Sequence, residues 1–320
     1  MSFVHEDPQF EQLLGIVARE TGIAEALIEK DYWVTHTLWA LHETGLEIWF
    51  KGGTSLSKGF GLIQRFSEDL DLMIQPGAET GLPNVRSWTS TNRGPVARRQ
   101  AFYDALANAL VVPSVPIKRD RSRIDKRARS ADYLGHYPGV RLNQLAPALS
   151  PFVRLEVGHA RVVPRVKKML SSFVHDYVDA QGMLGDYDDN RPRAVRCVHP
   201  LVTLFEKLDA IARRYSRDPV EADTFVRHYE DSAQIIRCVD DLPPIKMTVV
   251  ELAQDMVAKK DMRALPSPDE PALRLDDPDK RAAIERAYTK IAPMFWGHRI
   301  PLDEACSVIR SWLGRQEWNR

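Results

Sequence analysis

The segment Phe50–Met73, FKGGTSLSKGFGLIQRFSEDLDLM, constrains the fold more than any other part of the chain. It predicts the end of a short strand, a tight turn at Gly52 and Gly53, a helix, and a second strand that carries two aspartates. Glycine has no Cβ and tolerates positive φ, so the backbone at this turn can approach a ligand closely. Free backbone amides beyond such a turn can hold an anion such as a phosphate.

The two aspartates of the predicted second strand lie on one face of it, because alternate residues of a strand point to the same side. That face carries Arg65, Ser67, Asp69 and Asp71, and the opposite face carries Leu70, Leu72 and Ile74. Mg²⁺ is usually bound by one or two carboxylates together with substrate phosphates. An Asp-x-Asp pair is also typical of an ordinary solvated strand face. With the glycine turn before it, the pair predicts a site for a nucleoside triphosphate and a divalent metal.

A third carboxylate is expected from a neighbouring strand, because two-metal sites need more than one pair of acids. The best candidate is Glu156 in Phe152–Val157, FVRLEV, which alternates polar and apolar residues. An acid in a mostly apolar strand is costly unless it is paired or bound to metal. The alternative is an ordinary solvent-facing position on an amphipathic strand.

Composition limits the class of protein less than these motifs do. The 320 residues are 44% hydrophobic and 28% charged, and the 44 basic and 44 acidic side chains cancel. Net charge therefore gives no argument for nucleic-acid binding. The three cysteines are widely spaced and form no metal or disulfide pattern. No apolar run approaches the roughly 18 residues of a membrane span, so we expect no membrane partner and a cytoplasmic protein.

Periodicity predicts an α+β fold with a mixed β-sheet core flanked by helices and a mostly helical C-terminal half. We expect a core domain over 1–192 and a helical region over 193–320. Predicted strands cover 46–50, 69–74, 111–117, 133–137 and 152–157. Predicted helices cover 8–21, 23–44, 56–63, 96–110, 167–178, 200–215, 220–238, 245–260, 278–292 and 302–314, with a Pro-rich linker over 266–278.

The motif GGTSL…RFSEDLDL closely resembles the first motif of the AbiEii/AbiGii (MenT-like) nucleotidyltransferase toxins. These toxins belong to the DNA polymerase β-type nucleotidyltransferase superfamily. Upstream, EKDYWVTHTLWAL at 29–41 is similar to the family's Lys-Asp-Tyr helix. Downstream, 199–214 resembles the family's lysine helix and 227–235 resembles its Arg-Asp-x-x-Asp motif. In the last of these, His228 stands where the family has its first acid.

The resemblance implies a role for each matching residue. Asp69, Asp71, Lys207 and Asp231 would be catalytic. Asp69 and Asp71 would hold Mg²⁺, with Mn²⁺ as the alternative, together with Glu156, which the strand pattern and not the resemblance proposes. The nucleoside triphosphate would be bound by Gly52, Gly53, Thr54, Ser55, Arg65, Ser67 and Lys207. Taken alone, Lys207 and Asp231 are also typical of solvated helix positions, and Thr54 or Ser55 of a helix cap.

The resemblance also implies a function: the toxin of a bacterial toxin–antitoxin or abortive-infection system. Such an enzyme transfers a nucleotide to an RNA acceptor, the 3′ end of tRNA, and blocks aminoacylation. Its expected protein partner is a cognate antitoxin of winged-helix type. Two alternatives stay open: a nucleotidyltransferase that modifies a protein or small molecule, and a degenerate, non-catalytic protein that only binds a partner.

A local excess of positive charge is the only sequence feature that points to RNA independently of the resemblance. Residues 117–130, IKRDRSRIDKRARS, carry seven basic and two acidic side chains, and Arg86, Arg93, Arg98 and Arg99 lie just upstream. Such a segment is typical either of a solvated loop or of a surface that contacts a phosphate backbone.

Overall fold

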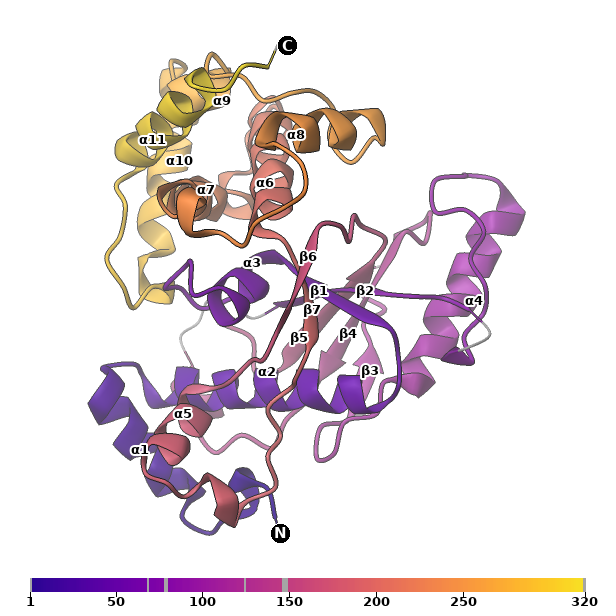
Figure 1. Ribbon diagram of the computed structural model, residues 1–320, viewed down its shortest axis with the longest axis vertical. Coiled ribbons are helices and arrows are strands. Elements are labelled where there is room, and N and C mark those ends of the chain that lie inside the picture. Colours follow the sequence, from indigo (N-terminus) through magenta and orange to yellow (C-terminus); the bar gives the residue numbers. More distant parts are fainter. Residues whose placement is uncertain (1, 68, 78–79, 124, 146–148, 319–320) are drawn as a thin grey trace. The chain divides into compact units, whose positions relative to one another are not determined.

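The structure is a computed structural model that describes residues 2–67, 69–77, 80–123, 125–145 and 149–318. The chain forms two compact units. The first contains residues 1–59, 67–160 and 167–197, and the second contains residues 60–66, 161–166 and 198–320 (Figure 1). A mixed sheet and its helices dominate the first unit and helices the second, which confirms the α+β class. Our boundary between residues 192 and 193 stays a prediction.

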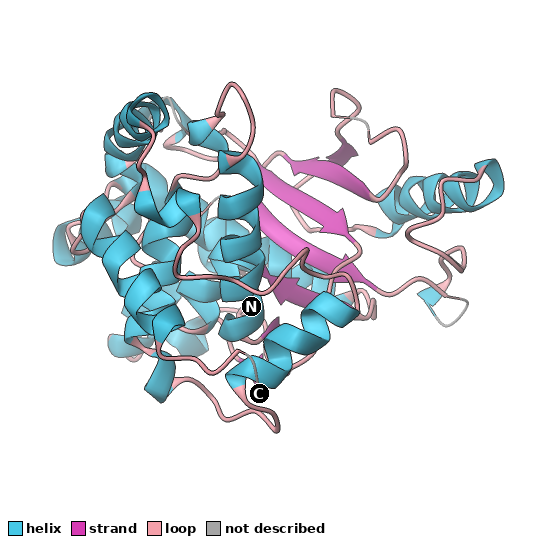
Figure 2. Ribbon diagram, turned by 90° about the horizontal axis from the view of Figure 1, so that it is seen from above, coloured by secondary structure: helices cyan, strands magenta, loops and turns pink. Residues whose placement is uncertain are grey.

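A seven-stranded mixed sheet forms the centre of the first unit, in the order β3-β4-β5-β2-β1-β7-β6. Strand β2 pairs antiparallel with β1 and parallel with β5, so it lies in the middle of the sheet. Helix α4 lies beside the β3 end of the sheet (Figure 2). The strands are β1 Ile48–Lys51, β2 Asp69–Ile74, β3 Ile117–Arg119, β4 Ser130–Gly135, β5 Val153–Gly158, β6 Arg165–Lys168 and β7 Val195–Val198.

The two faces of the central strands differ as the alternation of their residues predicts. In β2, Leu70 and Leu72 are fully buried, whereas Asp69 and Asp71 are half-buried on the other face. In β5, burial alternates along all six residues, with Arg154 and Glu156 on the half-buried face. This face of β2 and β5 therefore carries charged side chains while the opposite face packs into the core.

Several elements differ from the sequence prediction. The helix expected over 56–63 instead starts at the glycine turn, as α3 Gly52–Thr54 and η2 Ser55–Gly59. It ends there because Gly61 takes a left-handed φ of 64°. Residues 167–168 belong to strand β6, and the helix begins only at Phe173, where the side chain of Ser172 accepts a hydrogen bond from the His175 backbone.

Four further corrections concern strands and loops. The strand expected over 111–117 is the short β3 at 117–119, and β4 starts at Ser130 rather than Tyr133. Strand β7 was missed, since VRCV is too short to show a period. The linker expected over 266–278 contains helix α9.

Among the described residues of the first unit there are five α-helices, which contact strands of the sheet or other helices. Helix α2 is buried along most of its length and contacts α1, α5 and β5. A helix enclosed on all sides is expected to be apolar all round, yet α2 also carries Glu29, Lys30 and Asp31. These helices are α1 Phe10–Thr21, α2 Glu25–Glu43, α3, α4 Arg93–Ala109 and α5 Phe173–Ala180.

The buried charges of α2 are each matched by a partner. Asp31 pairs with Lys58 at 2.5 Å and accepts from the backbone nitrogen of Phe173, the first residue of α5. Lys30 donates to the carbonyl oxygen of Ser150. The Lys-Asp-Tyr helix thus anchors both α5 and the segment after the glycine turn. Besides its ion pair with Asp31, Lys58 donates a hydrogen bond to the carbonyl oxygen of Ser171, just before α5.

The second unit is helical, with α6 packed on α7 and α7 on α11. Residues 60–66 join it through the backbone, because Phe66 donates to Met294 at 2.7 Å and Trp296 donates to Gln64 at 3.1 Å. The helices are α6 Pro200–Tyr215, α7 Arg227–Arg237, α8 Val249–Ala258, α9 Pro271–Arg274, α10 Pro278–Lys290 and α11 Leu302–Gly314.

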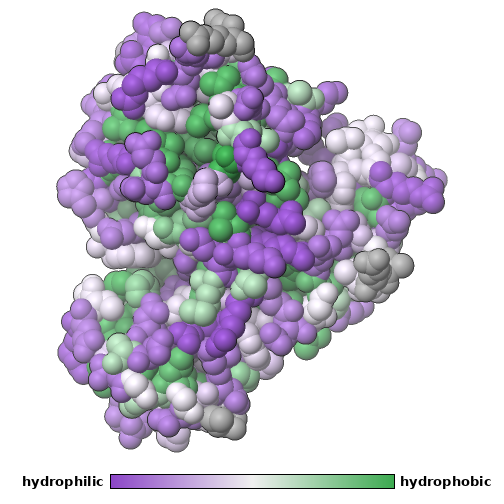
Figure 3. All heavy atoms as spheres, viewed as in Figure 1, coloured by the Kyte–Doolittle hydropathy of each residue, from purple (hydrophilic) through white to green (hydrophobic). Residues whose placement is uncertain are grey.

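Among the described residues, every helix is too short or too polar to cross a membrane. On the face drawn in Figure 3, apolar side chains form small patches between hydrophilic ones. Such a mixture is ordinary for a protein surface in water.

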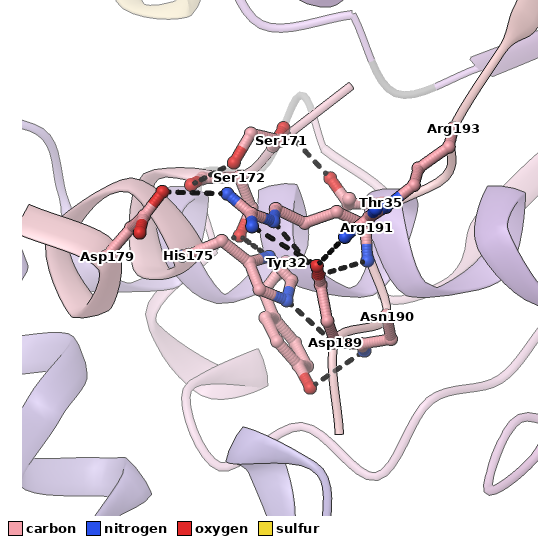
Figure 4. Close-up of polar contacts among 10 residues, drawn as sticks. All are labelled: Tyr32, Thr35, Ser171, Ser172, His175, Asp179, Asp189, Asn190, Arg191 and Arg193. Atoms are coloured by element: carbon pink, nitrogen blue, oxygen red, sulfur yellow. Dashed lines mark hydrogen bonds and ion pairs between the residues drawn. The ribbon is translucent and has the colours of Figure 1, made fainter. Parts of the chain in front are cut away.

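A buried polar network joins α2, α5 and the segment before β7 (Figure 4). Asn190 accepts from His175 at 2.6 Å, donates to Tyr32 at 3.1 Å, and lies 2.7 Å from Nδ1 of His36. Nε2 of His36 lies 3.0 Å from the carbonyl oxygen of Pro113. This arrangement suits neutral imidazoles, because a protonated His36 would direct an N–H at the Asn190 amide nitrogen.

Burial lowers the pKa of His175 to about 4, and it also lowers the pKa of His36. An unfolded chain binds these protons near pH 6.5, so it takes up more protons than the folded chain below that pH. The contribution of these histidines to the free energy of unfolding is therefore fully present above pH 6.5 and is lost as the pH falls toward 4. For His175 alone the slope approaches about 1.4 kcal/mol per pH unit.

We predict that His175→Gln flattens this dependence, because glutamine has no titrating group. The measurement is the free energy of unfolding in urea at pH 7 and at pH 5, with His136→Gln at an exposed position as the control. An equal difference between the two pH values in wild type and His175→Gln would contradict the account.

Candidate active site

The contact between Gly52 and Asp71 is the tightest feature of the glycine turn. Gly52 has a φ of 74°, and a Cβ at this position would lie 1.7 Å from Oδ2 of Asp71. Lys51, immediately before the turn, is the register partner of Asp71 across β1 and β2. The Asp71 carboxylate thus rests directly against the backbone of the turn, and only glycine leaves room for it.

Thr54 ties the turn to the aspartate strand through its side chain. Its hydroxyl oxygen lies 2.6 Å from the carbonyl oxygen of Asp69 and 2.9 Å from that of Ser67. Gly53, Thr54 and Ser55 are all buried, whereas Ser67 is half-buried. Ser55 lies beside the thiol of Cys197, whose pKa burial raises to about 11. In this structure the hydroxyl of Thr54 is therefore a hydrogen-bond donor to the backbone at the start of strand β2.

Glu156 joins the two aspartates on the charged face of the sheet. Strands β2 and β5 run parallel, with Asp71 opposite Glu156 and Asp69 opposite Arg154. Burial, reinforced by the charges of Asp71, Asp69 and Asp132, raises the pKa of Glu156 to about 7. Asp69, Asp71 and Glu156, here called the acid row, therefore bring three carboxylates to neighbouring positions on two paired strands.

No three Asp, Glu, His or Cys side chains of the described chain are gathered closely enough to hold a metal ion by themselves. Mg²⁺ usually takes one or two carboxylates and completes its octahedron with water and substrate phosphates, and the magnesium site stays a prediction. The chemistry of the donor set, all hard oxygen, fits the same ion.

Sequence reasoning missed a second group of acids beside the acid row. Arg154 contacts Asp120 at 3.1 Å, Asp132 at 3.2 Å and Asp69 at 3.7 Å. Asp132 lies opposite Glu156 in the antiparallel pairing of β4 and β5. The signal for this group was the alternation of polar residues in β4, and the strand predicted there began at Tyr133 and so left out Asp132.

The second unit contains a buried cluster of three charged residues, which we call the helical cluster: Arg65, Lys207 and Asp231. Arg65 donates to both carboxylate oxygens of Asp231 at 2.7 Å, and Lys207 donates to Oδ2 at 2.8 Å. Helix α6 supplies Lys207, helix α7 supplies Asp231, and Arg65 lies in the segment that pairs with Phe295.

Two cations share one carboxylate in the helical cluster. Burial alone would raise the pKa of Asp231, but Arg65 and Lys207 outweigh it and hold this pKa well below its usual value. Burial lowers the pKa of Lys207 and that of neighbouring His228, which lies 3.5 Å from the Lys207 ammonium. A buried positive charge next to a neutral imidazole suits an anionic ligand such as a phosphate.

The structure thus sorts the predicted site residues into two groups. The first unit holds Gly52, Gly53, Thr54, Ser55, Ser67, Asp69, Asp71 and Glu156, and the second holds Arg65, Lys207 and Asp231. Within the second group, Asp231 contacts both Lys207 and Arg65. The guanidinium of Arg65 also contacts the carbonyl oxygen of Phe66, and its binding of nucleotide stays a prediction. An acidic residue nearer to Arg65 in the sequence, Glu68, lies outside the described residues.

A glycine turn that seats a strand aspartate, beside a row of acids on a mixed sheet, is the arrangement expected of a nucleotidyltransferase. Residues 37–308 match the family described as nucleotidyl transferase AbiEii toxin of type IV toxin–antitoxin systems. The chain therefore belongs to this family, and the resemblance drawn from its motifs is confirmed. The match also covers 76–150 and most of 245–320, where the motifs gave no alignment. No curated protein matches the chain in sequence.

We predict that Gly52→Ala abolishes the activity of the site, because the added Cβ would overlap the Asp71 carboxylate. The left-handed backbone alone should cost about 1–2 kcal/mol. Gly22→Ala is the matched control, with a φ of 70° and no atom within 4 Å of the added Cβ. The measurements are urea unfolding and transfer of labelled nucleotide.

Both variants pay the backbone cost, but only Gly52→Ala displaces Asp71. Equal activity in the two variants would show that the contact between Gly52 and Asp71 does not matter for function.

Proposed function

We propose that this member of the AbiEii family is a Mg²⁺-dependent enzyme that transfers a nucleotide from a nucleoside triphosphate to RNA. The acceptor would be the 3′ end of tRNA, so that transfer blocks aminoacylation and translation. Family membership supports nucleotidyl transfer, toxicity and a cognate antitoxin, for which we retain the winged-helix type as a proposal. The observation that carries the proposal is the packing of Asp71 on Gly52, within a row of three acids.

Asp69, Asp71 and Glu156 would hold the metal ion, with Mn²⁺ as an alternative to Mg²⁺. The positions of the three carboxylates support this assignment, because Asp71 and Glu156 lie opposite each other on neighbouring strands and Asp69 lies on the same strand as Asp71. When bound, the metal would supply charge neutralisation at the phosphates and would ease deprotonation of the attacking hydroxyl.

The chain's own residues would bind and orient the triphosphate. Backbone amides at Gly52 and Gly53 would face its phosphates, because a glycine turn lets the backbone approach a ligand closely. Thr54 would position Asp69 through the strand backbone, and Ser55 and Ser67 would shape the turn. Lys207 would contribute positive charge to the triphosphate, while Arg65 and Asp231 keep its ammonium in place.

In the proposed reaction, the acceptor hydroxyl attacks the α-phosphorus in line with the leaving group. A bond forms between the acceptor oxygen and the α-phosphorus, and the bond from that phosphorus to the bridging oxygen breaks. Pyrophosphate leaves with the electron pair, and the hydroxyl proton passes to a carboxylate or to water. Positioning and electrostatic stabilisation would supply most of the rate enhancement.

We predict that Asp71→Ala and Lys207→Ala both remove transfer of label from α-labelled triphosphates to total RNA. Loss of one charged group that stabilises the reacting phosphates costs roughly 10²–10³-fold in rate. Lys290→Ala serves as the control, because this lysine is exposed and pairs only at the surface with Asp223.

Wild-type transfer by Asp71→Ala would refute the proposed chemistry. Separating RNA from protein after the reaction also tests the acceptor: label on protein alone would replace RNA by a protein acceptor. Absence of any Mg²⁺-dependent turnover of the four triphosphates would favour the non-catalytic alternative.

A further inference from the structure

A basic loop in the first unit is held by hydrogen bonds from a buried arginine side chain. The described part of this basic loop, residues 120–123 and 125–129, lies between β3 and β4, and residues 117–130 carry a net charge of +5. Its carboxylates are paired: Asp120 contacts Arg154, and Asp125 accepts from the backbone nitrogens of Arg127 and Arg129 and forms an ion pair with the Arg129 guanidinium. The exposed basic side chains around it are Lys118, Arg121, Arg123, Lys126, Arg127 and Arg129.

Arg99 on α4 is the residue that pins this loop. It is fully buried, and its guanidinium donates to the carbonyl oxygens of Ser87, Ser90, Arg127 and Ala128 at 2.6–3.1 Å. This corrects the expectation that Arg99 forms part of the basic surface. A merely solvated loop needs no buried cation to fix its backbone, whereas a binding surface gains from preorganisation.

Two aromatic rings lie at the same edge of the sheet. The rings of Trp88 and His159 stack with centroids 5.1 Å apart and an angle of 6° between their planes. His159 directly follows β5, and Ser130, where β4 begins after the basic loop, pairs with Gly158 at the end of β5. The hydroxyl of Tyr103, whose ring neighbours Trp88, donates to the carbonyl oxygen of Arg129. The aromatic pair and the basic loop therefore share one edge of the first unit.

This edge is close to the acid row. Glu156 precedes Gly158 by two residues, a rise of about 7 Å along a strand. A chain that reaches the acid row with one end would then pass the aromatic pair and the basic loop.

We infer that the basic loop and the Trp88–His159 pair form a binding surface for single-stranded nucleic acid. Exposed arginines and lysines would contact successive phosphates, and an unpaired base would stack on the aromatic pair, as in other single-strand binding surfaces. A duplex would present phosphates but no free base face. The inference rests on the proposed function only in taking this strand to be the acceptor RNA.

The test is binding without nucleotide, so that it is independent of catalysis. The probe is a labelled single-stranded RNA of about 12 nucleotides, within the usual range of such sites, and binding is followed by fluorescence anisotropy over a salt series. Lys126→Glu/Arg127→Glu should weaken binding roughly tenfold or more, and should reduce the salt slope by about 1.4 for two lost phosphate contacts. The control is Arg19→Glu/Lys167→Glu, two exposed bases on α1 and β6.

His159→Ala and Trp88→Ala test the stacking half of the inference. Each should weaken binding of the single strand roughly 5- to 150-fold and leave a duplex of the same sequence unchanged. His159 is exposed, so its substitution should not disturb the fold.

Equal binding by the loop variant and the control would overturn the inference. The inference would also be overturned if the loop variant lost as much affinity for polyglutamate as for RNA, because the surface would then bind an acidic protein. It would equally be overturned if the protein bound the duplex as tightly as the single strand and the two aromatic variants bound RNA like wild type. If the loop variant loses RNA binding but the wild-type protein transfers no nucleotide, this inference stands and the proposed function is refuted. If the wild-type protein transfers nucleotide but the variants bind RNA normally, the proposed function stands and this inference is refuted.

Discussion

The direct packing of the Asp71 carboxylate on the backbone of Gly52 is the constraint on which the candidate site depends. It requires a residue without a Cβ that tolerates a φ of 74°, and it fixes how β1, the turn and β2 meet. The hydroxyl of Thr54 then secures the backbone of β2 at Asp69. Because β2 lies in the middle of the sheet, this fixed strand also sets the register that places Asp71 opposite Glu156.

The two groups of charged residues have opposite sign. In the acid row, burial and the neighbouring carboxylates raise the pKa of Glu156, and in the helical cluster two cations surround the carboxylate of Asp231. Buried charged groups are costly unless they are paired or bind a ligand.

The sequence predicted the parts of the site that depend on short-range periodicity. The parity of Asp69 and Asp71 and of Arg154 and Glu156 follows from alternation along single strands, and the family match confirms the fold class. It could not predict ties between distant segments, such as Arg65 with Asp231, 166 residues apart. It also could not find β7, which is too short to show a period. It could not show that Arg99 is buried, because a buried arginine and a solvated one look the same in a basic stretch of sequence.

Binding of Mn²⁺ to the protein, followed by the relaxation of water protons, tests most directly whether the acid row is a metal site. Asp71→Asn keeps the size of the side chain and removes its charge, and Glu20→Gln, an exposed acid on α1, is the matched control. The account predicts that Asp71→Asn weakens Mn²⁺ binding roughly tenfold or more, while Glu20→Gln leaves it unchanged, since even residues that only support metal ligands contribute that much. Equal affinity in wild type and Asp71→Asn would contradict it.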